Sequence, residues 1–147
     1  MLLQKKINSN NLKNTQRVEN QKIKQKLMLQ FFTSFKQKEH LFPNVSPRLI
    51  ENDFKKSLKN ILSFSPEIIS VGVSDDECVY IYFEKNNKSV YFDLFFEPEQ
   101  ETEVSLTIFE NKESKVSYID YLDNSIINLK NEFIVENELS HLSFAEI

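Results

Sequence analysis

The residues best suited to catalysis or metal binding are few in this chain, and they stand apart from one another. His40 and His141 are the only histidines, and Cys78 is the only cysteine. Neither histidine has an Asp, Cys or second His at the spacing found in Cys-x-x-Cys or His-Glu-x-x-His sites. We therefore expect two surface histidines and neither a metal nor a cofactor.

Cys78 follows Asp75, Asp76 and Glu77. Neighbouring anions raise the pKa of a thiol, so this arrangement predicts an inert, partly buried cysteine and no nucleophile. Gly72 is the single glycine, which excludes glycine-rich phosphate loops and Gly-x-Ser-x-Gly elbows. The sequence thus predicts a protein that is not an enzyme.

Four glutamates alternate along one polar segment: Glu97, Glu99, Glu101 and Glu103. Paired carboxylates can bind calcium or serve as acid and base. Calcium loops, however, usually combine Asp and Asn with a glycine at the turn, and this segment has no glycine. We interpret these charges as solubilising groups beside a phenylalanine-rich strand.

The net charge of −4 conceals a strong division along the chain. Residues 1–40 carry nine basic and two acidic side chains, a net charge of +7. Residues 41–147 carry nine basic and twenty acidic side chains, a net charge of −11. Such asymmetry indicates separate roles for the two parts or attraction between them. Apolar runs are only a few residues long, and the N-terminus has no secretory pattern, so we expect a cytoplasmic protein.

Helical periodicity occurs in three places. Residues 1–17 have no apolar pattern and are predicted to be a polar basic tail. Residues 18–40 predict a basic amphipathic helix with its apolar stripe on Ile23, Leu27, Phe31 and Phe35. A second helix is expected from Ser46-Pro47 to about Ser63, and a last one after Asp120, with Asp120 as its N-cap.

Strand periodicity begins after Pro66, and strands are predicted at 67–73, 78–84, 89–97, 103–110 and 114–119. Their connections are short enough for hairpins, with Asn86-Asn87 in left-handed positions. The expected fold is α+β: an antiparallel meander sheet of about five strands with helices packed on one face, preceded by the basic amphipathic N-terminal helix. The domain would span 41–136, followed by a tail at 137–147.

Alternation sorts the strand residues onto two faces. One face is wholly apolar and should lie under the helices; its members are Val79, Ile81, Phe83, Val90, Phe92, Leu94, Phe96, Val104, Leu106 and Ile108. The other face is aromatic and acidic, with Tyr80, Tyr82, Glu84, Tyr91, Asp93, Phe95, Glu97, Ser105, Thr107 and Phe109.

The second face has three interpretations. The basic N-terminal helix could cover it within the chain or in a dimer, a partner could bind it, or its aromatic residues could be ordinary exposed strand formers. Aromatic residues are enriched at interfaces. As partner-binding residues the sequence favours Tyr80, Tyr82, Tyr91, Asp93, Phe95 and Glu97.

Together these features favour a small protein-binding module, such as an immunity, antitoxin or inhibitor-type protein that neutralises a basic partner. The alternative is an oligomeric structural or adaptor protein assembled through residues 18–40. Nucleic-acid binding through the basic arm ranks third. The acidic body would repel nucleic acid, and only Arg17 and Arg48 carry the side chain best suited to reading guanine.

Overall fold

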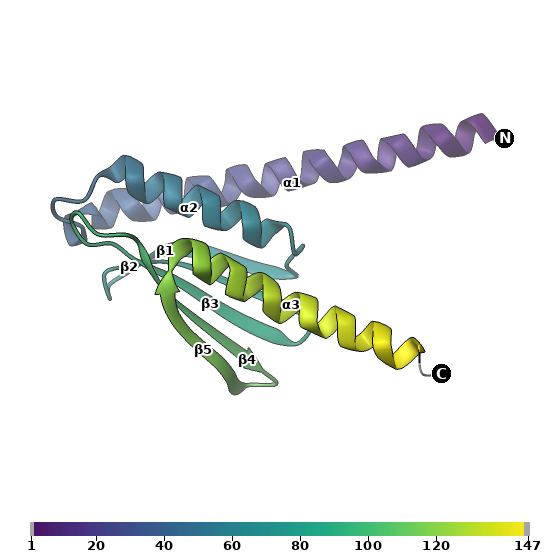
Figure 1. Ribbon diagram of the computed structural model, residues 1–147. Helices are drawn as coiled ribbons and strands as arrows, with labels where there is room; N and C mark the ends of the chain where they lie inside the picture. Colours follow the sequence, from purple (N-terminus) through teal and green to yellow (C-terminus); the bar gives the residue numbers. More distant parts are fainter. Residues whose placement is uncertain (1, 146–147) are drawn as a thin grey trace.

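The computed structural model describes the backbone of residues 2–145 and the side chains of 20–113 and 116–134. Five strands form one sheet with the order β1-β2-β3-β4-β5, and every neighbouring pair is antiparallel (Figure 1). The elements in chain order are α1 Leu2–Lys38, the short 3-10 helix η1 Glu39–Leu41, α2 Pro47–Leu62, β1 Ile68–Ser74, β2 Cys78–Lys85, β3 Lys88–Phe95, β4 Glu103–Glu110, β5 Glu113–Tyr121 and α3 Leu122–Ala145. The predicted α+β meander is confirmed.

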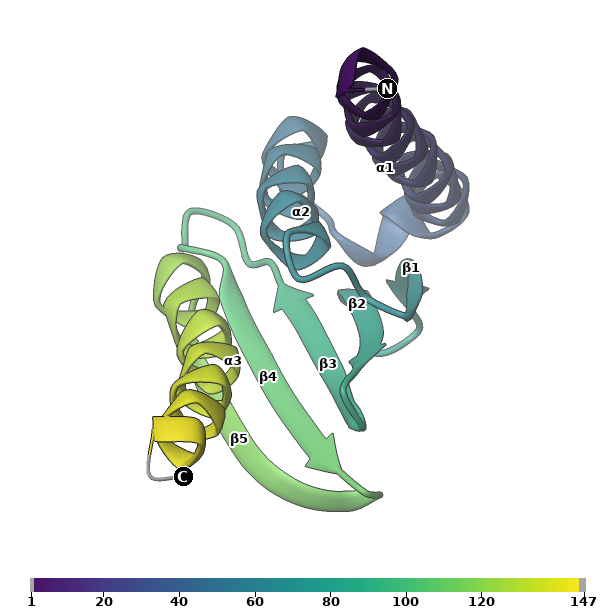
Figure 2. The same cartoon turned by 90° about the vertical axis from the view of Figure 1, so that its right-hand side faces the viewer.

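All three helices lie on one side of the sheet (Figure 2). α1 runs beside β1, α3 covers β4 and β5, and α2 lies between them. The structure is therefore a two-layer sandwich of helices on a sheet, which is a stable way to bury one apolar sheet face.

The core forms where the predicted apolar face meets the helices. Its sheet residues are fully buried, and α2 contributes Ile50, Phe54, Leu58 and Ile61 to the same cluster. α2 starts as predicted, since the Ser46 side chain accepts a hydrogen bond from the Leu49 N–H group and Pro47 takes the first helical position.

α1 belongs to this core and also covers the edge of β1. Phe31 is buried and stacks on Phe54 of α2, with 4.1 Å between the ring centroids. The backbone N–H of Val73 donates to the Ser34 hydroxyl at 2.8 Å, and Lys38 donates to the Val73 carbonyl at 3.1 Å. These two side chains satisfy groups at a strand edge that would otherwise remain open for pairing.

The interpretation that this helix covers the aromatic face within one chain is therefore wrong. An apolar stripe flanked by lysines suits either face of the sheet, and Phe31 finds its partner on α2 instead. The predicted stripe is correct at Leu27 and Phe31, which are buried, and at Phe35, which is partly buried against the core. Ile23 is 43% exposed.

The helices at both ends are longer than the sequence pattern indicated. α1 begins at Leu2, and α3 continues to Ala145, so helical backbone extends into the predicted tails at 1–17 and 137–147. The side chains of these segments lie outside the described residues, and the predicted domain boundaries remain predictions. α3 begins at Leu122, so Asp120 sits one residue too early to be its N-cap. Its carboxylate accepts from the Tyr121 N–H and the Asn124 side chain.

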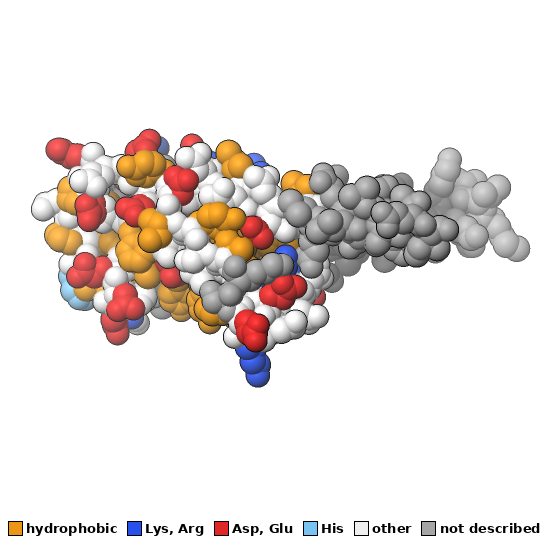
Figure 3. Space-filling model, turned by 60° about the horizontal axis from the view of Figure 1, so that its bottom comes forward, with side chains coloured by type: hydrophobic (Ala, Val, Ile, Leu, Met, Phe, Trp, Pro, Cys, Tyr) orange, Lys and Arg blue, Asp and Glu red, His pale blue; other side chains and the backbone are white. Residues whose placement is uncertain are grey.

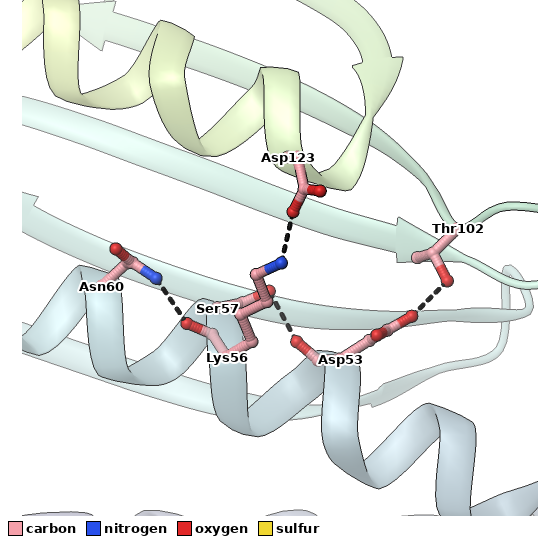
Figure 4. Close-up of polar contacts among 6 residues, drawn as sticks. All are labelled: Asp53, Lys56, Ser57, Asn60, Thr102 and Asp123. Atoms are coloured by element: carbon pink, nitrogen blue, oxygen red, sulfur yellow. Dashed lines mark hydrogen bonds and ion pairs between the residues drawn. The ribbon is translucent and has the colours of Figure 1, made fainter.

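Polar contacts join the helices to each other and to the loop between β3 and β4 (Figure 4). Lys56 of α2 pairs with Asp123 of α3. Asp53 of α2 accepts a hydrogen bond from the Thr102 hydroxyl in the loop. In the part of the chain that the structure describes, none of the helices has the length and apolar character needed to cross a membrane.

Two hairpin turns use left-handed residues in place of glycine. Asn86 and Asn87 have φ of 52° and 63°, which confirms their predicted role between β2 and β3. Asn111 and Lys112 have φ of 52° and 68° between β4 and β5. Two consecutive residues with positive φ are typical of the type I′ turn, whose twist matches that of the strands. Asparagine tolerates this conformation, but lysine is strained in it.

Replacing Lys112 by glycine should stabilise the protein, because glycine adopts positive φ without a steric penalty. The expected gain in the free energy of unfolding is about 0.5–1 kcal/mol, measured by denaturant titration. Lys59→Gly, at an exposed position of α2, is the matched control and should destabilise the protein by about 1 kcal/mol, since glycine is a poor helix former. A loss of stability in Lys112→Gly would contradict this interpretation of the turn.

Candidate protein-binding face

The sheet surface opposite the helices is called here the open face. Because α1, α2 and α3 all lie on the other side, it is exposed to solvent (Figure 3). In Figure 3 hydrophobic and acidic side chains lie next to one another over this side, with few lysines among them. The larger residues that alternation and register place on the open face are Ile68, Tyr80, Tyr82, Glu84, Tyr91, Asp93, Phe95, Glu103, Phe109, Ile119 and Tyr121.

The exposure of this surface is high for apolar side chains. The exposed fraction is 43% for Tyr91, 37% for Phe95, 72% for Ile119 and 53% for Tyr121. Single exposed apolar residues are normal, whereas several on one sheet face are a feature of interaction sites. Polar residues of β4 separate those of β3 from those of β5. The open face therefore combines exposed aromatic and aliphatic side chains with acidic ones.

An aromatic ladder crosses the middle of the open face. Tyr82 and Tyr91 are directly opposite each other on β2 and β3, with ring centroids 4.8 Å apart. Phe109 of β4 meets Tyr91 edge-on at 5.7 Å. Cross-strand aromatic pairs of this kind stabilise a sheet and hold each ring in one orientation. A partner would meet a preorganised aromatic surface.

Gly72 explains where the Tyr80 ring lies. The two residues are opposite each other on β1 and β2. A Cβ atom on Gly72 would approach the Tyr80 hydroxyl oxygen to 2.7 Å and its ring carbons to 3.0 and 3.1 Å. The phenol therefore occupies the space that any other side chain at position 72 would need. The single glycine of the chain thus sets the shape of this part of the open face.

A hollow of about 680 Å³ lies at this end of the open face. Three tyrosines and three aspartates line it: Tyr80, Tyr82, Tyr91, Asp75, Asp76 and Asp93. Lys38 reaches its rim from α1, where its ammonium group pairs with Asp75 at 3.0 Å. The hollow therefore combines aromatic walls with a net negative charge.

Asp93 lies opposite Tyr80, on the central strand of the sheet. It is half-buried, and among the described residues neither a hydrogen bond nor an ion pair holds its carboxylate. Burial, and secondarily the nearby Asp76, raises the pKa of Asp93 above its ordinary value of 3.8. A carboxylate kept in such a place without a cation is a frequent mark of a functional site.

Cys78 also faces the hollow, and its chemistry agrees with the sequence-based prediction. The side chain is buried, and burial together with Asp93 and Asp76 raises the pKa of its thiol to about 11. The Ser74 hydroxyl opposes this shift only in part. The thiol is therefore protonated at neutral pH and is a poor nucleophile.

The structure brings together five of the six residues predicted as partner-binding. Tyr80, Tyr82, Tyr91, Asp93 and Phe95 all occupy β2 or β3 on the open face.

The placement of Glu97 on that face is wrong. β3 ends at Phe95, and Glu97 lies in the following loop, where its carbonyl accepts from the Gln100 N–H group.

Sequence reasoning missed four larger members of the face, which are Ile68, Glu103, Ile119 and Tyr121. Glu103 lies between Phe95 and Tyr121 in the cross-strand register, and Ile119 lies beside Ser105. The alternation of Ser117, Ile119 and Tyr121 carried this signal. Tyr121 was missed because the last strand extends two residues beyond its predicted end at 119, and the pairing of β4 with β5 has an irregularity between Ile108 and Phe109.

Other candidate sites are weaker. A hollow of about 410 Å³ lies where α2 and α3 begin, but its Lys56 and Asp123 pair with each other, as do Asp53 and Thr102. His40 is exposed in η1, and the side chain of His141 lies outside the described residues. In the described part of the chain, no three His, Cys, Asp or Glu side chains form a group that could hold a metal ion.

Comparison of the chain with protein-family models, with curated proteins and with solved structures found no match. The candidate site is therefore defined by the geometry and chemistry of its own residues.

Asp93→Asn should stabilise the folded protein at neutral pH. A carboxyl group with a raised folded pKa favours folding when protonated, and this contribution is lost as the pH rises from 3.8 through the raised value. Asparagine is uncharged throughout, so its advantage should be present at neutral pH, shrink as the pH falls through the raised pKa, and be gone below 3.8. Thermal unfolding at several pH values measures this difference. Asp123→Asn, which removes a carboxylate paired with Lys56, is the control and should give no gain in stability. If Asp93→Asn is less stable than the unmodified protein at neutral pH, the prediction is wrong.

Proposed function

We propose that this chain is a small, non-enzymatic protein-binding module whose open face engages a basic partner protein. The observation that carries the proposal is the uncovered aromatic and acidic sheet face, which no described helix shields. Aromatic side chains supply large contact areas with little loss of conformational freedom, and interfaces are enriched in them. The ladder of Tyr82, Tyr91 and Phe109 would form the centre of the contact.

Charge supports a basic partner. Residues 41–147 carry a net charge of −11, and basic side chains outnumber acidic ones only in residues 1–40. A strongly acidic surface attracts a positive cleft over a distance and raises the rate of association, an effect that salt weakens. The aromatic residues would then supply the contacts that slow dissociation.

Among protein-binding modules, we favour a neutraliser of the immunity, antitoxin or inhibitor type. A small acidic domain with a rigid aromatic face suits the blocking of a basic active site or nucleic-acid-binding cleft. The only cysteine is buried and unpaired, which fits the reducing conditions of a cytoplasmic location.

Substitution of the ladder tests this proposal. The partner is first captured from a lysate of the source cells and purified, and its affinity for the chain is then measured by calorimetry. Tyr82→Ala and Tyr91→Ala should each weaken binding about tenfold or more, the effect of losing a central aromatic contact. Ile127→Ala, which trims an exposed apolar residue on α3, is the control and should bind normally. Unchanged affinity in both tyrosine variants, with intact folding, would reject the open face as the interface.

A second candidate is assembly through α1, and one observation favours it. Leu29 and Phe32 are 67% and 42% exposed on the outer side of this helix, and with Met28 they line a hollow of about 630 Å³. An exposed apolar strip of this kind is suited to packing against a second helix.

Molecular mass in solution distinguishes the two candidates. If α1 drives assembly, light scattering should give a multiple of the mass of one chain, and Leu29→Glu should return the single-chain mass by placing a charge in the apolar contact. Gln30→Glu, at an exposed position of the same helix outside the hollow that Leu29 lines, introduces the same change of charge and is the control. A single-chain mass for the unmodified protein at high concentration contradicts assembly through α1.

A further inference from the structure

We propose that the hollow on the open face binds the guanidinium group of an arginine side chain presented by the basic partner. This inference rests on the proposed function and specifies the chemistry of its anchoring contact. Three features of the hollow carry it: its charge, its aromatic walls and a carboxylate that lacks a cation.

The charge of the hollow selects a cation. Its lining includes Asp75, Asp76 and Asp93 against the single ammonium group of Lys38. Lys38 is already held at 3.0 Å by Asp75 and at 3.1 Å by the Val73 carbonyl. Asp76 and Asp93 therefore remain to attract a further positive group.

The walls of the hollow favour a guanidinium group over a compact ammonium group. Tyr82 and Tyr91 are held against each other at 4.8 Å, and the Tyr80 ring lies over Gly72. Tyrosine faces attract cations within about 6 Å of the ring centroid. A guanidinium group is planar, so it can stack on a ring while its edge donates two parallel hydrogen bonds to a carboxylate.

Asp93 is the carboxylate placed to receive those hydrogen bonds. It lies beside Tyr80 in the cross-strand register and contributes to the same hollow. The contrast with the hollow between α2 and α3 is informative, because there Lys56 and Asp53 already have partners from the chain itself. Asp93 has none among the described residues, so an incoming cation would replace water without breaking an existing pair.

The inference is tested with a probe in place of the partner. The probe is Nα-acetyl-arginine amide, and the control compound is the citrulline analogue, which has nearly the same shape but no charge. Binding is followed by amide chemical shifts in two-dimensional NMR. The arginine compound should shift the amides of Tyr80, Tyr82 and Asp93, with a dissociation constant on the order of 1 mM, as expected of so small a ligand.

Two matched variants locate the site. Asp93→Asn should weaken binding of the arginine compound about tenfold or more, because a charge-assisted hydrogen bond is lost while the shape is kept. Asp123→Asn removes the same charge from the helix side of the molecule and should leave the affinity unchanged. Equal shifts with the citrulline compound, or unchanged binding in Asp93→Asn, would overturn the inference.

Failure of this inference is distinguishable from failure of the proposed function. If the arginine compound does not bind but Tyr91→Ala still weakens the captured partner, the open face is an interface without an arginine anchor. If the arginine compound binds and Tyr91→Ala leaves the partner unaffected, the hollow recognises cations but the open face is not the interface with that partner.

Discussion

The wholly apolar face of the sheet is the constraint on which the rest of the structure depends. Its residues on β2, β3 and β4 are fully buried, so every amphipathic helix in the described chain is drawn to the same side. Burial of one face leaves the opposite face without a cover from the described part of the chain. The exposure of the aromatic surface is therefore a direct result of how the core is built. Burial in the core does not determine which residue types stand on it.

Much of this fold could be predicted from the sequence, because period-two alternation and turn residues act locally. All five strands and the left-handed pair Asn86-Asn87 are instances. The position of α1 could not be predicted from the sequence, since its apolar stripe and its lysines suit either face of the sheet. Contacts between residues far apart in sequence decide it, namely the Phe31–Phe54 stack and the hydrogen bonds of Ser34 and Lys38 to Val73. The hollow was hidden for the same reason, since it depends on Tyr80 lying over Gly72 across two strands.

Asp93 is a charged residue at a position where folding alone favours a neutral one. Its carboxylate is half-buried at the centre of the sheet without a cation, and burial raises its pKa. Threonine or serine would suit such a position better if folding were the only requirement. Retaining an unfavourable charge on a rigid strand is the usual compromise at binding sites, where the partner supplies what the free protein lacks.

The order of the strands in the sheet is also their order in the chain, and the connections between them are only two to seven residues long. Each strand can therefore pair with the one before it as soon as a short loop closes, which keeps the loss of chain entropy at each step small. Sheets with such local pairing have a low contact order for their class and fold faster than Greek-key sheets of similar size. The slow step would then be the docking of α1, whose hydrogen bond from Val73 to Ser34 spans 39 residues of chain.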